Sequence, residues 1–317
     1  MQKSSTPLAR LKTTLRISYS LPFLLASLTG VAFALTKGGD AALGMLITCD
    51  VFVFALFANL ANDYYDHMSG ADKTRFKDDD PEFQKAALEI MGKRLYWDGN
   101  AFDLDYVSER TGKTVMGVLA ATALMIGVAI VYIAGSVAVP LGLIAFFLSY
   151  FYTAPPLNLG ARGLGELDVL ASFACMSFFS YYVMVQEFSA PMLLIALAVG
   201  LSVLLMRLVD EMTGYEAHLK AGEKDLCVRL GLEGAVRLVP YLLIVLYALA
   251  AMLLLYSVTY ALLFLTVMTS VKIVRYLRAV DDRFRFVRPV FETMKLAVGT
   301  EILVILALIA QTAWTYL

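Results

Sequence analysis

Long apolar segments, separated by short polar ones, make up most of this 317-residue chain. An apolar segment of about 20 residues is long enough to cross the hydrocarbon core of a bilayer as a helix. The pattern therefore predicts an all-α, polytopic membrane protein, a bundle of nine transmembrane helices in a single domain over residues 1–317. The predicted spans lie at roughly 16–36, 41–61, 115–135, 137–152, 167–186, 190–209, 237–256, 258–274 and 294–315.

Composition and the placement of charge fit this prediction. Hydrophobic residues are 60% of the chain and charged ones 17%, whereas about a quarter of residues are charged in soluble domains. If the N-terminus is cytoplasmic and nine spans alternate from there, all 26 Lys and Arg except Lys37 lie on the cytoplasmic side. Such a bias marks cytoplasmic loops. We therefore expect an integral protein of the cell (inner) membrane, with the N-terminus in the cytoplasm and the C-terminus outside.

The longest polar segment, residues 73–113, is expected to be a cytoplasmic loop with an amphipathic piece from Pro81 to Arg94. Ordered loops of this length tend to be lids or binding elements. A solvated appendage is the other interpretation.

An acidic cluster closes the second predicted span. If the helix continues, positions 59, 62, 63 and 66 share one face, because three- and four-residue steps bring side chains together. Carboxylates gathered there repel one another unless a positive charge lies among them. The cluster consists of Asn59, Asn62, Asp63 and Asp66, with Asp72 on the turn beyond Gly70.

A second acidic cluster closes the span at 190–209, which occupies a comparable place in the other half of the chain. Oxygen ligands of this kind suit Mg²⁺, which usually bridges a few carboxylates to substrate phosphates. Nearby Lys and Arg would stabilise a departing pyrophosphate, while an isoprenoid tail would lie between the apolar helices. Solvated carboxylates at helix ends are the plainer alternative. The cluster contains Arg207, Asp210, Glu211 and His218, followed by Lys220, Lys224 and Arg229.

Other polar residues allow two interpretations each. Asp50 and Glu301 lie inside predicted spans, where a carboxyl is costly; each is either a cavity residue or a carboxyl bonded to a neighbouring helix. His67 is either a proton carrier or a hydrogen-bonding residue at the interface. The basic run at 275–288 favours anionic lipid headgroups over nucleic acid.

Three stretches resemble a known family. The stretch from Asn62 to Asp72 resembles the first aspartate-rich motif, NDxxD…D, of the intramembrane aromatic prenyltransferases of the UbiA superfamily. Residues 152–166, with Arg162 as their basic residue, are similar to the loop after the fourth helix of that family, and residues 221–231 to the stretch after its second motif. The appearance is nearest to the 1,4-dihydroxy-2-naphthoate polyprenyltransferase branch of menaquinone biosynthesis.

The resemblance implies a cytoplasmic-side active-site cavity and Mg²⁺-dependent transfer of a polyprenyl group from its diphosphate to an aromatic, quinone-precursor acceptor such as a naphthoate. Pyrophosphate would leave an allylic carbocation for the ring to attack. Membrane lipid surrounds such an enzyme, and nucleic acid is not an expected partner. The implied metal ligands are Asn62, Asp63 and Asp66, assisted by Asp72; the implied diphosphate contacts are Arg162, Lys220, Lys224 and Arg16; the implied catalytic carboxylates are Asp63, Asp66 and Asp210.

The second motif departs from the family pattern. Where that pattern, within Glu-x-x-Asp-Tyr-Glu-Ala-Asp, has metal-binding aspartates, this chain has Gly214 and His218. Asp210 lies one turn earlier and could reach the same metal, Glu211 matches the pattern, and His218 could either ligate the metal or form a hydrogen bond. The second Mg²⁺ site is therefore left open.

Two other functions stay open at this point. An enzyme of this type could cyclise or hydrolyse a prenyl diphosphate, or use a non-aromatic acceptor. A transporter or lipid-binding membrane protein is a different class, favoured by Asp50 and Glu301. The chain shows no inverted pair of broken helices of the kind transporters use.

Overall fold

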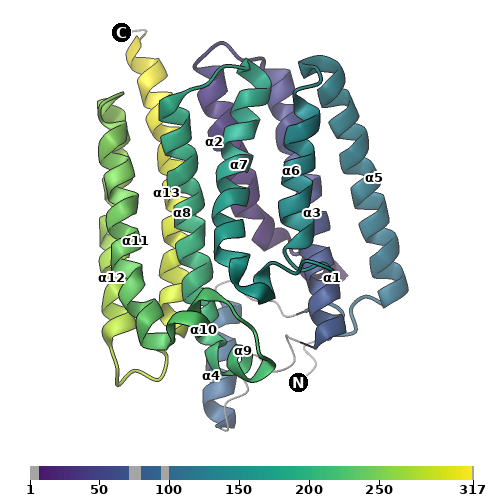
Figure 1. The fold of residues 1–317 in the computed structure, drawn as a ribbon, viewed down its shortest axis with the longest axis vertical. Helices are drawn as coiled ribbons and strands as arrows, with labels where there is room; N and C mark the ends of the chain where they lie inside the picture. Colours follow the sequence, from purple (N-terminus) through teal and green to yellow (C-terminus); the bar gives the residue numbers. More distant parts are fainter. Residues whose placement is uncertain (1–6, 71–79, 94–99, 316–317) are drawn as a thin grey trace.

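The computed structural model describes residues 7–70, 80–93 and 100–315, and every regular element in these ranges is helical. The all-α prediction is thereby confirmed for the described chain. The long helices run side by side in one layered bundle (Figure 1). They are α2 (Leu21–Leu35), α3 (Ala41–Ser69), α5 (Glu109–Ala134), α6 (Ala138–Phe151), α7 (Gly165–Val185), α8 (Ala190–Thr213), α11 (Leu232–Leu253), α12 (Val267–Arg278) and α13 (Val287–Thr315).

Shorter elements surround the ends of the bundle. They are α1 (Pro7–Thr14), the 3₁₀ turn η1 (Ile17–Ser20), α4 (Pro81–Lys93), the π-helical turn η3 (Gly160–Leu164), α9 (Tyr215–Ala221), α10 (Leu226–Leu230) and the 3₁₀ segment η4 (Val258–Thr266). Helix α4 coincides with the amphipathic piece expected within the long loop.

Eight helical segments of the described chain are long and apolar enough to cross a bilayer. The ninth predicted span corresponds to α6, an apolar helix of 14 residues, which is shorter than the roughly 20 residues that a bilayer core requires. Helix α6 nevertheless packs within the bundle, against α7, α5 and α3. The structure thus gives eight full-length candidates and one short helix where nine spans were expected.

Helix α8 is the centre of the bundle. It packs against α7, α11 and α13, and 72% of its most apolar window is buried. Helix α5 is at the other extreme, with 11% buried, as expected for a helix whose apolar side chains face lipid. Because neighbouring helices cover most of α8, they restrain it, and α8 in turn positions the residues at its end.

Helices α2 and α7 approach each other closely because of Gly30. A Cβ built there would lie 2.0 Å from the carbonyl oxygen of Ser177. Close to this contact, the hydroxyls of Ser27 and Ser180 are 3.0 Å apart. Helix α2 begins directly after η1, which follows Arg16.

The elements that carry both acidic clusters lie at one end of the bundle. The C-terminal part of α3, together with α4, α9 and α10, is at the bottom of Figure 1, whereas α13 ends at the top. Gly70 ends α3 in the left-handed conformation, with φ 76°, which glycine adopts without steric cost.

Candidate functional site

The first acidic cluster is helical from Asn59 to Asp66, because α3 continues past its apolar part to Ser69. Asn62 donates from Nδ2 to Oδ2 of Asp66, one turn further on, at 3.0 Å. Asn59 lies one turn earlier and donates to Oγ of Ser20 at 3.1 Å. The expected alignment of these side chains along one helix surface is therefore present for Asn62 and Asp66.

Asp63 lies apart from that pair. It is fully buried, and its Oδ1 is 2.8 Å from a terminal guanidinium nitrogen of Arg16. Arg16 has φ 46°, in the left-handed region, and its guanidinium lies 4.7 Å from the ring centre of Tyr19. A carboxylate without exposure to water requires such a partner. Asp63 and Arg16 were expected to contact metal and diphosphate respectively, and the structure pairs them with each other.

A turn within the long polar segment 73–113 packs against the first motif. Asn100 donates from Nδ2 to the backbone oxygen of Asp63 at 2.8 Å. Asp103 contacts Nδ1 of His67 at 2.6 Å, and the ring of Phe102 lies 5.7 Å from that of His67. His67 is therefore a hydrogen-bonding residue here, one of its two expected roles. Through these contacts the turn at 100–106 holds the last part of α3 in place.

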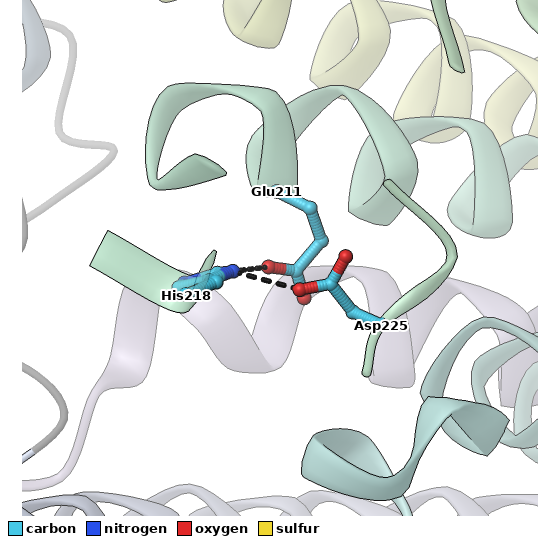
Figure 2. A group of neighbouring side chains, drawn as sticks. All are labelled: Glu211, His218 and Asp225. Atoms are coloured by element: carbon cyan, nitrogen blue, oxygen red, sulfur yellow. Dashed lines mark hydrogen bonds and ion pairs between the residues drawn. The ribbon is translucent and has the colours of Figure 1, made fainter. Parts of the chain in front are cut away.

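The second acidic cluster joins three helices. Glu211 at the end of α8 pairs with Arg207 on the same helix and with Nδ1 of His218 on α9, the latter at 2.8 Å. The same Nδ1 is 2.9 Å from Oδ2 of Asp225, which precedes α10 (Figure 2). Asp210 is 3.8 Å from Arg207. Asp225 was not predicted, although an Asp directly before an apolar run is the signal of a helix N-cap, and it does cap α10.

Electrostatics in this cluster strongly favour a charged histidine. Burial disfavours protonation of the ring, but hydrogen bonds to Asp225 and Glu211 outweigh burial and raise the pKa of His218 to about 10. Burial likewise opposes ionisation of Asp225, yet bonds from His218 and the Val228 backbone lower the pKa of that carboxyl. The two groups therefore form an ion pair near neutral pH.

The loops after α6 and α9 contact each other beside this cluster. Arg229 donates to the backbone oxygen of Arg162 at 2.9 Å, and Glu166 accepts from the backbone nitrogen of Leu226 at 2.8 Å. Gly163 has φ 82°, and a Cβ there would lie 2.1 Å from the carbonyl oxygen of Lys224. The side chains expected to bind diphosphate on these loops, Arg162, Lys220 and Lys224, are all exposed.

The two carboxyls inside the spans occupy different surroundings. Asp50 lines a cavity of about 140 Å³ between α3, α5, α6 and α7, whose other walls are mainly apolar. Glu301 on α13 is fully buried, and its carboxyl oxygens have no hydrogen-bond partner among the described residues. Asp72 lies outside the described residues.

The residues of the first motif fit a magnesium ion. Asn62 and Asp66 offer carboxamide and carboxylate groups from neighbouring turns, held together by their mutual hydrogen bond, and Mg²⁺ prefers oxygen donors. In the second cluster Glu211, His218 and Asp225 each place one possible ligand atom within 4.8 Å of the others. The ligand atoms there already bond to one another, so proximity alone does not make that cluster a metal site.

Comparisons with known proteins agree with this architecture. The model of the UbiA prenyltransferase family matches residues 99–297, which include the second cluster and not the first. A 1,4-dihydroxy-2-naphthoate octaprenyltransferase of Haemophilus influenzae is 28% identical over 67% of this chain and 66% of its own length. A 2-carboxy-1,4-naphthoquinone phytyltransferase of Synechocystis is 34% identical over 34% of this chain and 36% of its own length. The chain thus matches about a third to two thirds of the length of these curated relatives.

Solved structures show the same fold over nearly the whole chain. A UbiA homologue from Archaeoglobus fulgidus bound to GPP and Mg²⁺ superposes with a TM-score of 0.61 and 17% identity, covering 93% of this chain and 99% of that one. The apo structure of a homologue from Aeropyrum pernix K1 gives a TM-score of 0.54 and 15% identity, covering 94% and 98%. This chain is an integral membrane protein that belongs to the UbiA prenyltransferase family.

Proposed function

We propose that this protein transfers a polyprenyl group from its diphosphate to an aromatic quinone precursor, a naphthoate, within the membrane. The observation that carries the proposal is the Asn62–Asp66 pair. It belongs to the C-terminal part of α3, which lies at the same end of the bundle as α9 and α10 (Figure 1). Arg162, Lys220 and Lys224, on or next to η3, α9 and α10, are exposed. Carboxylates for a metal and cations for a diphosphate are the two requirements of this chemistry. The naphthoate substrates named for the relatives from Haemophilus influenzae and Synechocystis support the choice of acceptor.

The chain's polar end would bind the diphosphate. Asn62 and Asp66 would hold Mg²⁺, with Asp63, Asp72 and Asp210 as further carboxylates of the site. Mg²⁺, when bound, would neutralise the charge of the diphosphate and of the departing pyrophosphate. Arg162, Lys220 and Lys224 would contact phosphate oxygens directly. Arg16, which precedes η1 and α2, would contact them as well. Glu211 and His218 are considered separately below.

The apolar helices would hold the tail and exclude water from the reacting carbon. The C–O bond breaks with both electrons leaving on pyrophosphate, and the allylic cation forms a C–C bond with an electron-rich ring carbon. The ring carbon then loses its proton, or CO₂ if it carries a carboxylate, and the electron pair of the broken bond restores aromaticity. Exclusion of water protects the cation from hydrolysis. We further propose that the N-terminus and this polar end face the cytoplasm and that the C-terminus lies outside, in the inner membrane.

The experiment uses the full chain in lipid nanodiscs with a labelled polyprenyl diphosphate, Mg²⁺ and 1,4-dihydroxy-2-naphthoate. A lipophilic adduct of the two substrates is expected, and Asp66→Asn should reduce its rate by roughly 100-fold or more, as for loss of a group that stabilises a transition state. Asp281→Asn is the matched control, because Asp281 is exposed between α12 and α13. Adduct formation that is unchanged in Asp66→Asn would refute the assignment. Pyrophosphate release without an acceptor would instead identify a cyclase or hydrolase.

A further inference from the structure

The second acidic cluster has the composition of a metal site but not its bonding pattern. All four carboxylate oxygens of Glu211 and Asp225 already face a donor. Oε1 of Glu211 pairs with Arg207, and Oε2 lies 2.8 Å from Nδ1 of His218. Oδ1 of Asp225 accepts from the backbone nitrogen of Val228 at 2.8 Å, and Oδ2 lies 2.9 Å from the same Nδ1 of His218.

Nδ1 of His218 lies between the two carboxylates, where a metal ion shared by them would have to sit. An imidazole nitrogen next to two carboxylate oxygens carries its proton, because an unprotonated nitrogen and a carboxylate are both acceptors. Nδ1 of His218 is therefore a donor in this cluster (Figure 2). A metal ion could bind Nδ1 only after displacing that proton and both hydrogen bonds.

The two buried carboxylates of the cluster, Glu211 and Asp225, each have a cationic partner without a metal ion. Glu211 and Asp225 contribute two negative charges, and Arg207 and protonated His218 contribute two positive ones. Both carboxylates are buried, with 3% and 1% of their residue surface exposed. Buried charges are tolerated when they are paired and hydrogen-bonded in this way. Asp210, 3.8 Å from Arg207, and Glu223, 3.9 Å from Nδ1 of His218, are further carboxylates at the edge of this set, and each lies beside a cation that the protein itself supplies.

Gly214 explains how the histidine fits. A Cβ built on Gly214 would lie 2.8 Å from Nε2 of His218 and 3.2 Å from its Cε1. The imidazole ring thus lies directly against the glycine, in the space that any side chain at position 214 would need. The two positions at which this chain departs from the pattern of its family are therefore coupled: the small residue at 214 makes room for the ring at 218.

We propose that His218 is a built-in cation that replaces a divalent metal ion at the second motif, so that this chain binds divalent metal only at its first motif. His218 is then a positioning residue. Through Asp225 it fixes the start of α10 and the preceding Lys224, whose carbonyl lies against Gly163. The inference rests on the proposed function only in assuming a metal at the first motif.

Metal affinity tests the proposal on the full chain in nanodiscs, with Mn²⁺ alone as the probe and its binding followed by electron paramagnetic resonance. Asp66→Asn should weaken Mn²⁺ binding by roughly 10-fold or more, as changes around a metal site do. His218→Gln should leave the affinity and the number of bound ions unchanged or raise them. The double variant Gly214→Asp/His218→Asp should bind one more Mn²⁺ than the wild-type chain. Weaker Mn²⁺ binding by His218→Gln, or the loss of one ion from it, would overturn the proposal.

A second measurement needs no variant at the cluster. The chain contains only two histidines, so ¹⁵N-histidine spectra of the wild-type protein are simple, and His67→Gln assigns them. The His218 ring nitrogens should keep the shifts of protonated nitrogens when saturating Zn²⁺ is added. A metal-bound shift at His218 would refute the built-in cation. Neither Mn²⁺ binding nor the histidine spectra depend on prenyl transfer. If the proposed function is wrong, the adduct assay will show it, and these two measurements will still test the role of His218.

Discussion

Arg16 and Asp63 form an ion pair of 2.8 Å between a residue just before η1 and the second residue of the first motif, with 12% and 0% of their side chains exposed. Removing one partner leaves the other charge buried, which costs about 3 kcal/mol or more. We therefore expect Asp63→Asn and Arg16→Gln each to destabilise the protein by about that amount. The double variant should lose less stability than the sum of the two single losses, because the second change removes a charge that is already unpaired.

Unfolding by SDS in mixed micelles measures these four free energies. Arg283→Gln is the control, because Arg283 and Asp80 form an ion pair of similar length, 2.8 Å, with 57% and 39% of their side chains exposed. Exposed pairs contribute about 0–1 kcal/mol. Strictly additive losses in Arg16→Gln and Asp63→Asn would mean that the two residues do not act as a pair.

Asn100 is expected to stabilise the first motif from below. Its side chain donates to the Asp63 backbone oxygen and accepts from the backbone nitrogen of Phe102, and it is 3% exposed. Asn100→Ala leaves the buried backbone nitrogen of Phe102 unpaired, at about 1–3 kcal/mol, and removes the side-chain bond to the Asp63 carbonyl, which keeps its partner within α3. The same unfolding assay should show this loss, whereas Thr114→Ala at an exposed position of α5 should change stability by about 0.5 kcal/mol or less. Equal effects of the two variants would refute a positioning role for Asn100.

The stability supplied by His218 should decline in alkaline solution. Its folded-state pKa of about 10 exceeds the ordinary value of 6.5, so the contribution is complete below pH 6.5 and is lost as the pH rises through 10. In EDTA, the melting temperature of the wild-type protein should therefore fall between pH 7 and pH 10 toward that of His218→Gln. Parallel melting curves for the two proteins over this range would contradict the ion pair with Asp225 and Glu211.

Gly163 should be intolerant of any side chain. Alanine there meets both the unfavourable φ of 82° and the Lys224 carbonyl at 2.1 Å, and strained left-handed positions cost about 1–3 kcal/mol. Because Gly163→Ala separates the two loops that carry Arg162 and Lys224, KM for the prenyl diphosphate should rise more than kcat falls. Gly117→Ala on α5, where a Cβ would meet nothing within 4 Å, is the control. An unchanged KM would show that the contact of the loops does not matter for binding.

The long helices were accessible to sequence reasoning because their signal is local. Apolar runs gave their positions, and i, i+4 spacing gave the Asn62–Asp66 pair. The helices extend one or two turns beyond several runs, as α3 does to Ser69, because polar residues continue a helix once it leaves the bilayer core. The apolar run at 137–152 predicted a full span, but α6 has only 14 residues. Hydropathy shows where a chain is apolar and does not show where the helix itself begins and ends.

The contacts that complete each motif come from distant parts of the chain. Nothing in the sequence pairs Arg16 with Asp63, or Asn100 with the Asp63 carbonyl, because such contacts depend on how helices pack. The His218–Asp225 bond is local in sequence, yet it needs α9 to fold back, which the αL turn at Gly222 (φ 73°) allows. The departure at 214 and 218 was visible in the sequence, whereas the steric reason for it required the coordinates.

The contacts of Asp63 also have a consequence for biogenesis. Its carboxylate partner, Arg16, precedes α3 in the chain, whereas its carbonyl partner, Asn100, follows α3 beyond the whole segment that contains α4. A nascent chain that has inserted α3 therefore still lacks the Asn100 bond to its first motif until residue 100 has left the ribosome. The first two helices can therefore enter the membrane before the contacts of Asp63 are complete.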